Sequence, residues 1–490
     1  MLVEVVLTAA LAVLLWAAFF RKPEGLPPGR WGLPAIGFIP LTRKSMEEQI
    51  LDLHKKHGNI VLWRIGNQLM VFISDYQLGK EALSRSDFAN RPDWDMFKLL
   101  EEVPLGVGSS NGAHWHANRR FALRQLRDLG MGKSKLVAGI QEQALKLVEI
   151  LKQQANKAAP VPHALKVAVV NVIWQMVAGK MFEMEDEKLI EFDKLLKDLN
   201  AATFAVGVRD FFPGLKYLPK YLQNILFSMD RIEGFKEKFL NYLDELVIEH
   251  KASLDPDNPG DLIDAYLLEL KEGSESPDVI RSERDLGLLV LDLFFAGSET
   301  TTYTLTFMMQ YLAMNPDIQK TMQEEIDQVL PKGILATLED KPRLPYTEAV
   351  LHEILRLSSL LPVGAQHSAV TDTQLGGYYI PKGTIIATSA MSMHSDPRYW
   401  EKPEALKPER WLDENGKFTT KKEGFMPFGS GKRACLGESL ARMELLIFAT
   451  AMLQSLSFAP PPGSTVDVTA DPAVPMFHTP RNQDIFITIR

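Results

Sequence analysis

The residue with the most distinctive chemistry in this chain is Cys435, the one cysteine among 490 residues. It stands in a loop, residues 428 to 437, that reads Phe-Gly-Ser-Gly-Lys-Arg-Ala-Cys-Leu-Gly. Glycines let such a loop turn tightly and let its backbone approach a bulky ligand. The apolar, periodic segment from Glu438 to Gln454 predicts a helix just after the cysteine, and the free N–H groups at a helix start favour a thiolate. A lone cysteine is most often a small buried hydrophobe, so its neighbourhood has to indicate a reactive role.

A single thiolate restricts the metal chemistry that this loop can support. Zinc and iron–sulfur sites need several cysteine or histidine ligands, and the chain has no second cysteine. Haem iron needs only one axial protein ligand, and the electron density that a thiolate pushes onto it favours cleavage of the O–O bond. The loop therefore predicts haem, with Cys435 as the ligand of its iron.

A second candidate segment reads Ala296-Gly297-Ser298-Glu299-Thr300-Thr301 and follows an apolar run from Leu286 to Phe295. An acid and a hydroxyl are unusual beside such a run. We expect Gly297 to let a ligand approach the backbone, and Thr300 to bond the carbonyl one turn back, which opens the helix locally. Taken alone, the segment could equally be an exposed helical turn.

The two segments together resemble the cytochrome P450 family. The family's cysteine-loop pattern, Phe-x-x-Gly-x-Arg-x-Cys-x-Gly, is met from Phe428 to Gly437, and the resemblance covers nearly all of the chain. It implies haem b as the cofactor, Cys435 as its axial thiolate, and a role for Glu299 and Thr300 in delivering protons during oxygen activation. The residues implied to lie against the haem are Phe428, Gly429, Gly437 and Ala296.

The two propionates of a buried haem need hydrogen-bond donors around them. The segment Trp115-His116-Ala117-Asn118-Arg119 matches a Trp-x-x-x-Arg helix of the family. The resemblance implies that Trp115 and Arg119 bind propionates together with Arg433 and His367, and alignment to the family adds Arg91. His367 could instead be an ordinary loop histidine.

A further group of charges is predicted to hold the fold. Glu353 and Arg356 stand at i, i+3, which places them on one helix face. By itself this is a common surface pair. The resemblance implies that it joins Arg410, from Pro408-Glu409-Arg410-Trp411, in a buried network behind the haem.

The apolar pattern predicts a mainly α fold with a small β region, of the α+β class. Two apolar runs, residues 60–65 and 69–73, predict a strand pair around Gly66-Asn67. A long helical run from about Ser282 to Ala313 stops at Asn315-Pro316, because proline cannot continue a helix. The resemblance implies the cytochrome P450 fold for a catalytic domain of residues 41–490.

Residues 1–22 predict a transmembrane signal anchor. The run from Leu2 to Phe20 is apolar apart from two residues, and about 20 such residues span a bilayer core. Arg21 and Lys22 follow at once, and positive charge prefers the cytoplasmic side, so we expect the catalytic domain there. A buried core helix is the alternative. The proline-rich residues 23–40 predict a stiff hinge.

The formal net charge of −8 gives no support for a nucleic-acid partner. Arg120, Arg124 and Arg127 line one face of the helix that contains Trp115, and Lys432 adds a further positive charge. This face is either simply solvated or a docking patch for an acidic electron donor. The chain shows no dinucleotide or flavin fingerprint, so electrons should come from another protein. The resemblance implies NADPH–cytochrome P450 reductase, with cytochrome b5 as a second candidate.

Several stretches, among them Ser110-Asn111-Gly112 and Leu126 to Lys133, look like microsomal family-2 members, including those of arthropods. This likeness implies a protein of the endoplasmic reticulum membrane. The regions that the resemblance assigns to substrate contact are apolar, which predicts a lipophilic small molecule such as a xenobiotic, steroid, fatty acid or terpenoid.

Three classes of function stay open on these grounds. A monooxygenase, which inserts one atom of dioxygen by hydroxylation or epoxidation, is favoured by Cys435 together with Glu299 and Thr300. A haem-thiolate isomerase or dehydratase would need no reductase, and it usually lacks the acid–threonine pair. A non-catalytic haem-binding protein would bind ligands at its iron without turnover.

Overall fold

The computed structural model describes residues 22–490, except 40, 41, 43, 99, 131–133, 274–276, 421, 475 and 476. The apolar run of the predicted transmembrane anchor, Leu2 to Phe20, lies outside these described residues. Within the part of the chain that is described, no helix is both long enough and apolar enough to span a bilayer.

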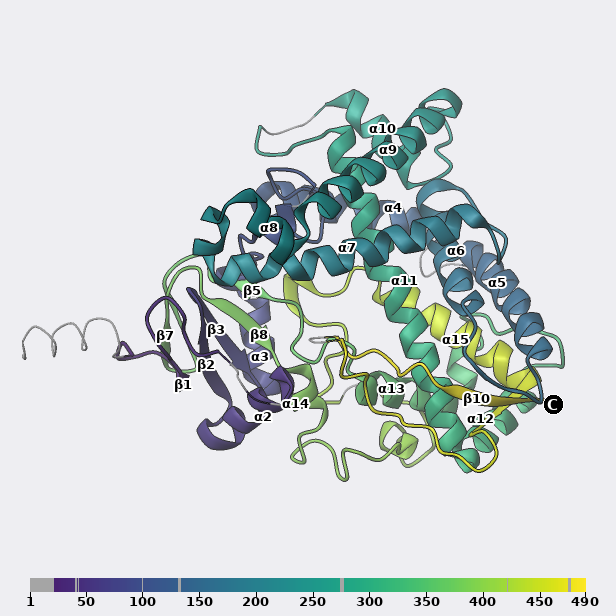
Figure 1. The fold of residues 1–490 in the computed structure, drawn as a ribbon. Helices are drawn as coiled ribbons and strands as arrows, with labels where there is room; N and C mark the ends of the chain where they lie inside the picture. The colour runs from purple at the N-terminus through teal and green to yellow at the C-terminus, as the bar shows by residue number, and fades with distance from the viewer. Residues whose placement is uncertain are drawn as a thin grey trace, which may run out of the picture.

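Helix α11 (Glu283–Met314) runs through the centre of the molecule, as Figure 1 shows. The Ser282 hydroxyl caps its first turn by accepting from the N–H of Asp285 at 3.0 Å. The helix ends at Asn315, because Pro316 begins α12 (Pro316–Val329) and cannot continue the preceding hydrogen-bond ladder. This confirms the long helix predicted over 282–313, and its middle carries Glu299 and Thr300.

The remaining helices pack around α11, which confirms a mainly helical fold. Helices α6 (Ala164–Ala178), α13 (Pro345–Ser358) and α15 (Glu438–Ser455) contact it directly. The other helices are α2 (Met46–His57), α3 (Tyr76–Ser84), α4 (Gly112–Asp128), α5 (Ser134–Gln153), α7 (Glu187–Phe211), α8 (Lys220–Phe227), α9 (Met229–Ser253), α10 (Leu262–Glu272) and α14 (Ala390–His394).

A sheet with the strand order β1-β2-β3-β8-β5 lies at one end of the molecule (Figure 1). Strands β2 (Ile60–Ile65) and β3 (Gln68–Ile73) form an antiparallel hairpin around Gly66-Asn67, which confirms the predicted strand pair. A later part of the chain joins the same sheet. The remaining strands are β1 (Gly29–Arg30), β4 (Ala158–Pro160), β5 (His367–Ser368), β6 (Thr373–Leu375), β7 (Tyr378–Ile380), β8 (Ile385–Thr388), β9 (Leu456–Ala459) and β10 (Asp484–Ile489).

Part of the proline-rich segment packs against this sheet. Strand β1 pairs in parallel with β2. The guanidinium of Arg30 donates to Gln49 Oε1 at 2.6 Å and lies 4.6 Å from the ring centroid of Trp63. The N–H of Tyr379 also donates to the Gly25 carbonyl at 2.8 Å, so the chain is attached to the catalytic domain from Gly25 onward, and the limits of the hinge stay a prediction.

The charges predicted to hold the fold do form a buried network. Arg356 donates to both oxygens of Glu353, at 3.0 and 2.7 Å. Arg410 Nε donates to Glu353 Oε1 at 2.9 Å, and Trp411 Nε1 donates to Oε2 at 2.8 Å. Glu353 and Arg356 are buried. The network ties α13 to the 408–411 turn, which lies far from it in sequence.

Candidate active site

Cys435 lies just before α15, where the 428–437 loop turns back on itself. Its N–H donates to the carbonyl of Phe428 at 2.9 Å. Gly431 has φ +70°, and a Cβ there would stand 1.9 Å from the carbonyl oxygen of Leu83. Since no L side chain fits such an approach, glycine is required, and the tight loop predicted from the sequence is confirmed.

The helix start does not by itself make Cys435 a thiolate. Burial raises the pKa of the Cys435 thiol, and hydrogen bonds from the N–H groups of Gly437 and Glu438 offset only part of that rise. The N–H groups at the helix start thus favour the thiolate, as expected, but burial outweighs them. A metal cation bonded to the sulfur would deprotonate it outright.

Cys435 has accessible surface, although protein atoms surround its side chain on most sides. Phe295 and Ala296 also have accessible surface, and Phe295 is 43% exposed, although α11 lies at the centre of the fold. At Gly429, with φ +69°, a Cβ would meet no other atom within 4 Å. An apolar surface on α11 and a sulfur in a glycine-lined loop suit a flat apolar group bonded to that sulfur.

Three of the predicted propionate ligands, Arg433, Trp115 and Arg119, lie together beside the cysteine loop. The Arg433 guanidinium donates to the carbonyls of Ala89 at 2.8 Å and Ser110 at 2.7 Å, and it stacks 3.8 Å from the ring centroid of Trp115. Arg119 Nη2, also on α4, donates to the Ala434 carbonyl beside the cysteine at 2.6 Å.

Arg91 and His367 meet the same group from the other side. Arg91 donates to the carbonyls of Gly108 at 3.2 Å and Gln366 at 2.7 Å. His367 is buried on β5, with its Nδ1 2.7 Å from the Phe88 carbonyl oxygen. The structure thus places all five predicted propionate ligands in one region.

This cluster of cations fits a buried dianion. Burial and the charges of Arg91 and Arg119 lower the pKa of Arg433 to about 8. Burial lowers the pKa of Arg91 to about 10 and that of His367 to about 3. A guanidinium keeps its proton in proteins, so an anion has to relieve this electrostatic cost. The buried Nε1 of Trp115 has no hydrogen-bond partner, which adds a donor for the same anion. The residues present therefore fit the two carboxylates of haem.

The centre of α11 confirms one expectation and corrects another. The Thr300 hydroxyl donates to the Ala296 carbonyl at 2.8 Å, one turn back, as predicted. A Cβ on Gly297, however, would lie 2.5 Å from Cδ1 of Ile173 on α6. Gly297 therefore allows two helices to pack closely, and our expectation that it faces a ligand is wrong.

Glu299 takes part in an ion-pair cluster that reaches two other helices. Its carboxylate lies 3.1 Å from Nζ of Lys166 on α6, and Lys166 also pairs with Asp193 on α7. Lys197 Nζ lies 2.9 Å from Asp193. A hydrogen bond also joins Glu299 to Tyr303, one turn further along α11. Glu299 is therefore held on the side of α11 that faces α6 and α7.

The basic face of α4 is present, with one change from the prediction. Arg120, Arg127 and Lys432 are exposed, and the positive charges of Lys432 and Arg120 lie close enough to His116 to help lower its pKa, mainly a result of burial. Arg124 is also exposed, but its guanidinium pairs with Glu269. Among the described residues, the other three of the four predicted cations thus form no ion pair.

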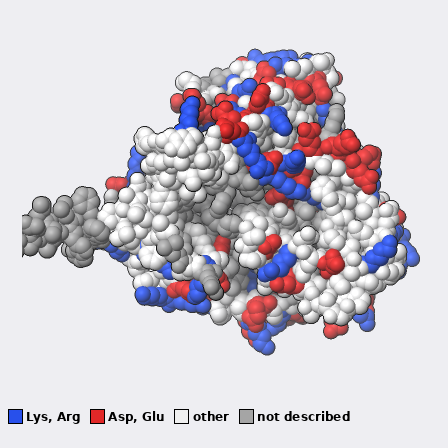
Figure 2. All heavy atoms as spheres, viewed as in Figure 1, with Lys and Arg blue, Asp and Glu red and all other residues white. Residues whose placement is uncertain are grey.

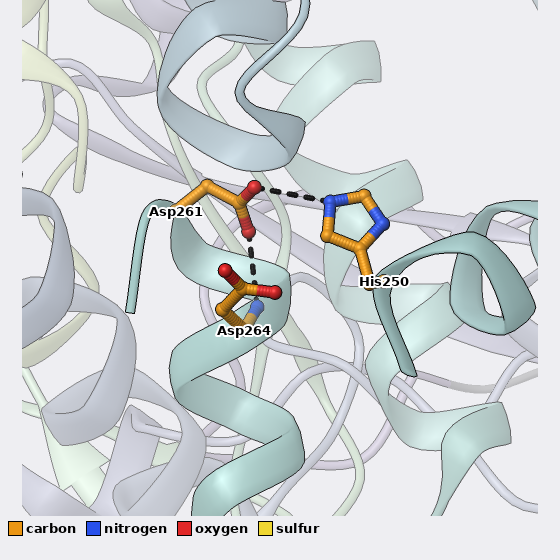
Figure 3. A group of neighbouring side chains, drawn as sticks. All are labelled: His250, Asp261 and Asp264. Atoms are coloured by element: carbon orange, nitrogen blue, oxygen red, sulfur yellow. Dashed lines mark hydrogen bonds and ion pairs between the residues drawn. The ribbon is translucent and has the colours of Figure 1, made fainter. Parts of the chain in front are cut away.

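Among the described residues, one group has the spacing of metal ligands, namely His250, Asp261 and Asp264 (Figure 3). Asp261 caps α10, since its Oδ1 accepts from the N–H of Asp264 at 3.0 Å. Its Oδ2 lies 3.0 Å from Nε2 of His250 on α9. These contacts account for the group as a clamp between two helices, so we assign it no ion.

Sequence reasoning missed several acids that surround the site. Asp292 lies within the run Leu286 to Phe295, and Asp285 lies directly before it. Both acids contact the loop before α4. Glu444 is buried in α15, and a hydrogen bond joins it to Thr301. A lone acid within an apolar run was a signal for Asp292 and Glu444. The partners of Glu299, Lys166 and Asp193, gave no local signal.

Comparison with known proteins agrees with this geometry. The family model described as Cytochrome P450 matches residues 27–486. Cytochrome P450 2L1 of Panulirus argus is 41% identical over 474 residues, which cover 96% of each chain. Cytochrome P450 2J3 of Rattus norvegicus is 36% identical over 94% of this chain and 91% of its own. Cytochrome P450 2B4 of Oryctolagus cuniculus is 36% identical over 94% of each chain.

Proposed function

This chain belongs to the cytochrome P450 family and is a haem-thiolate monooxygenase, and we propose that it hydroxylates or epoxidises a lipophilic substrate with electrons from NADPH–cytochrome P450 reductase. One oxygen atom enters the substrate and the other leaves as water. The observation that carries the proposal is the cluster of Arg433, Arg91, Arg119 and Trp115 Nε1 beside the cysteine loop, since it fits the propionates of haem.

When bound, haem would supply an iron centre that activates dioxygen, and Cys435, the one cysteine, would supply the thiolate that holds the iron. The chain's own residues then bind the haem and supply protons. Trp115, Arg119, Arg433, His367 and Arg91 hold the propionates. Thr300 Oγ1 holds a proton, and the Glu299 carboxylate passes protons to it from the side of α6 and α7.

The electron donor docks on the basic face formed by Arg120, Arg127 and Lys432. Their positive charges attract an acidic partner and orient it before contact. The face belongs to α4 and the cysteine loop, which also hold Arg119 and Cys435, so a docked donor is close to the cofactor. Reductase is the proposed partner, and cytochrome b5 would use the same face.

The protein is anchored in the endoplasmic reticulum membrane with its catalytic domain in the cytoplasm. Besides the apolar run of residues 2–20, exposed apolar side chains support a membrane contact. Figure 2 shows few charged side chains over α8, where Ile225 is 74% and Leu226 56% exposed. Leu33 and Ile36 are also exposed. The β2–β3 turn contacts the second group through a hydrogen bond to the carbonyl of Ile36, and it contacts the end of α7 through a hydrogen bond to the carbonyl of Phe211.

The substrate is a lipophilic small molecule that lies against the apolar surface around Phe295 and Ala296. The test uses purified full-length protein with haem. We expect a red-shifted Soret band on reduction under carbon monoxide, a shift in spin state with some lipophilic compounds, and product only with NADPH, reductase and dioxygen. Product formed equally fast without NADPH or dioxygen would overturn the proposal. So would a Cys435→Ala variant with the same carbon monoxide band as the parent.

A further inference from the structure

We propose that Asp292 is a positioning residue for the propionate-binding arginines, and that it acts through the loop of residues 106–111. The proposal rests on the haem site described above. It assigns a function to an acid on α11 that contacts neither the cysteine loop nor the arginines by hydrogen bonds among the described residues.

Asp292 fastens the 106–111 loop to α11. Its Oδ2 accepts from the N–H of Val107 at 2.7 Å and from the N–H of Gly108 at 2.8 Å. The loop is shaped around this carboxylate. A Cβ on Gly106, where φ is +69°, would stand 2.3 Å from Oδ2, and a Cβ on Gly108 would stand 2.8 Å from Oδ1. Only glycine at these positions leaves room for the acid.

Asp285, two turns earlier on α11, adds a second fastening. Its Oδ1 accepts from the N–H of Gly106 at 2.8 Å and from Asn118 Nδ2, also at 2.8 Å. His114 Nε2 lies 3.0 Å from the same carboxylate. Because Asp285 also binds α4 through Asn118 and His114, its replacement would disturb several elements. Among the described residues, Asp292 has hydrogen bonds only to the loop, so it is the cleaner residue to test.

The opposite side of the loop holds the two arginines. The carbonyl of Ser110 accepts from Arg433 Nη2 at 2.7 Å, and the carbonyl of Gly108 accepts from Arg91 Nε at 3.2 Å. Asn111 Oδ1 accepts from Arg433 Nη2 at 2.9 Å and from the Arg91 N–H at 2.7 Å. A shift of this loop therefore moves both guanidinium groups. Groups that orient ligand-binding side chains in this way commonly set ligand affinity.

The charges around Asp292 are consistent with this arrangement. The charged groups that face it are Asp285 on its own helix and Arg91 from the loop side. Burial raises the pKa of Asp292 to about 6, and the two loop N–H groups oppose that rise. The carboxylate is therefore ionised at pH 8, the pH of the experiment below.

The experiment measures transfer of haem from the full-length holoenzyme to apomyoglobin, and hydrogen–deuterium exchange of peptides that span residues 104–110. For Asp292→Ala we expect at least fivefold faster haem transfer and faster exchange in these peptides. Asp292→Asn keeps one oxygen that can accept both N–H groups, so its rates should lie between those of Asp292→Ala and the parent. The effects of Asp292→Ala and Arg433→Lys on haem transfer should not add, because both act on the same guanidinium.

Glu325→Gln is the matched control. The Glu325 carboxylate accepts from the N–H groups of Tyr346 at 2.8 Å and Thr347 at 2.7 Å, remote from the 106–111 loop. Glu325→Gln should leave haem transfer unchanged. Parental rates of transfer and loop exchange in Asp292→Ala would overturn the proposal, as would an equal effect of Glu325→Gln. If Asp292→Ala does not fold, a parental transfer rate in Asp292→Asn overturns it. Absence of the red-shifted carbon monoxide band in the parent would instead refute the haem-thiolate site.

Discussion

Glu299 on α11 and Lys166 on α6 form an ion pair, with 3.1 Å between Oε1 and Nζ. The side chains are only 19% and 12% exposed, so solvent screens the pair weakly. Lys166 also binds Asp193 of α7. The proposed proton donor is therefore tied to two helices outside the haem site.

Replacement of Lys166 should disturb proton delivery. In Lys166→Met the carboxylates of Glu299 and Asp193 lose their shared cation and repel each other, so Glu299 leaves its position relative to Thr300. We expect more hydrogen peroxide per NADPH consumed, measured with reductase and a coupled substrate. Lys166→Arg should behave like the parent.

Lys197→Met is the matched control for this prediction, because Lys197 binds Asp193 but has no contact with Glu299 among the described ion pairs. It should leave the peroxide yield unchanged. Equal peroxide yields from the two methionine variants would show that the ion pair with Glu299 is not what matters.

Replacement of Thr300 should uncouple the enzyme without loss of haem. The Thr300 hydroxyl donates to the Ala296 carbonyl, and we propose that it holds a proton for the haem site. Thr300→Ala should keep the carbon monoxide band and raise peroxide per NADPH several-fold. Thr300→Ser, which keeps the hydroxyl, should restore most of the coupling. An unchanged peroxide yield in Thr300→Ala would argue against proton transfer at this hydroxyl.

Charge reversal on the basic face should weaken reductase docking. Arg120→Glu and Arg127→Glu should each raise the KM for reductase several-fold at low ionic strength, and the effect should shrink at high salt. Arg124→Glu should act less, because Arg124 already pairs with Glu269. Peroxide-supported turnover needs no reductase and should stay at the parental rate. An equal loss of peroxide-supported turnover would show that the basic face has a structural role and is not a docking site.

Glu444→Gln should stabilise the fold near neutral pH. Burial raises the pKa of Glu444 from 4.5 to about 8. Between these values only the unfolded state ionises, so stability falls as pH rises from about 4.5 to about 8 and changes little beyond. Removal of the acid should raise the free energy of unfolding at pH 7 by about 3 kcal/mol. Parallel pH profiles of thermal unfolding for parent and variant would contradict this.

Glu353→Ala should destabilise the fold strongly. It would leave the guanidinium of Arg356, whose side chain is 1% exposed, without its counter-ion. Breaking a buried pair from one side typically costs about 3–5 kcal/mol. Denaturant unfolding of the haem-bound protein should show a loss of that size. Lys407→Met, which breaks an exposed pair with Glu401, should have a much smaller effect.

Sequence reasoning succeeded where the chemistry is local. The glycines of the 428–437 loop, the hairpin around Gly66-Asn67 and the end of α11 before Pro316 each follow from the backbone preferences of a few neighbouring residues. The bond from Thr300 to the carbonyl one turn back is likewise a property of one helix. Such features need no knowledge of distant partners.

The sequence by itself determined that one thiolate is available to bind a metal, in a glycine-rich loop before a helix. Residue types and their spacing along the chain are enough to establish these features. Only the tertiary structure decided which groups surround that loop. Lys166 and Glu299 are 133 residues apart, and Gly297 faces Ile173 because α6 packs against α11. Helix packing determines such contacts, and it depends on side chains spread over the whole chain.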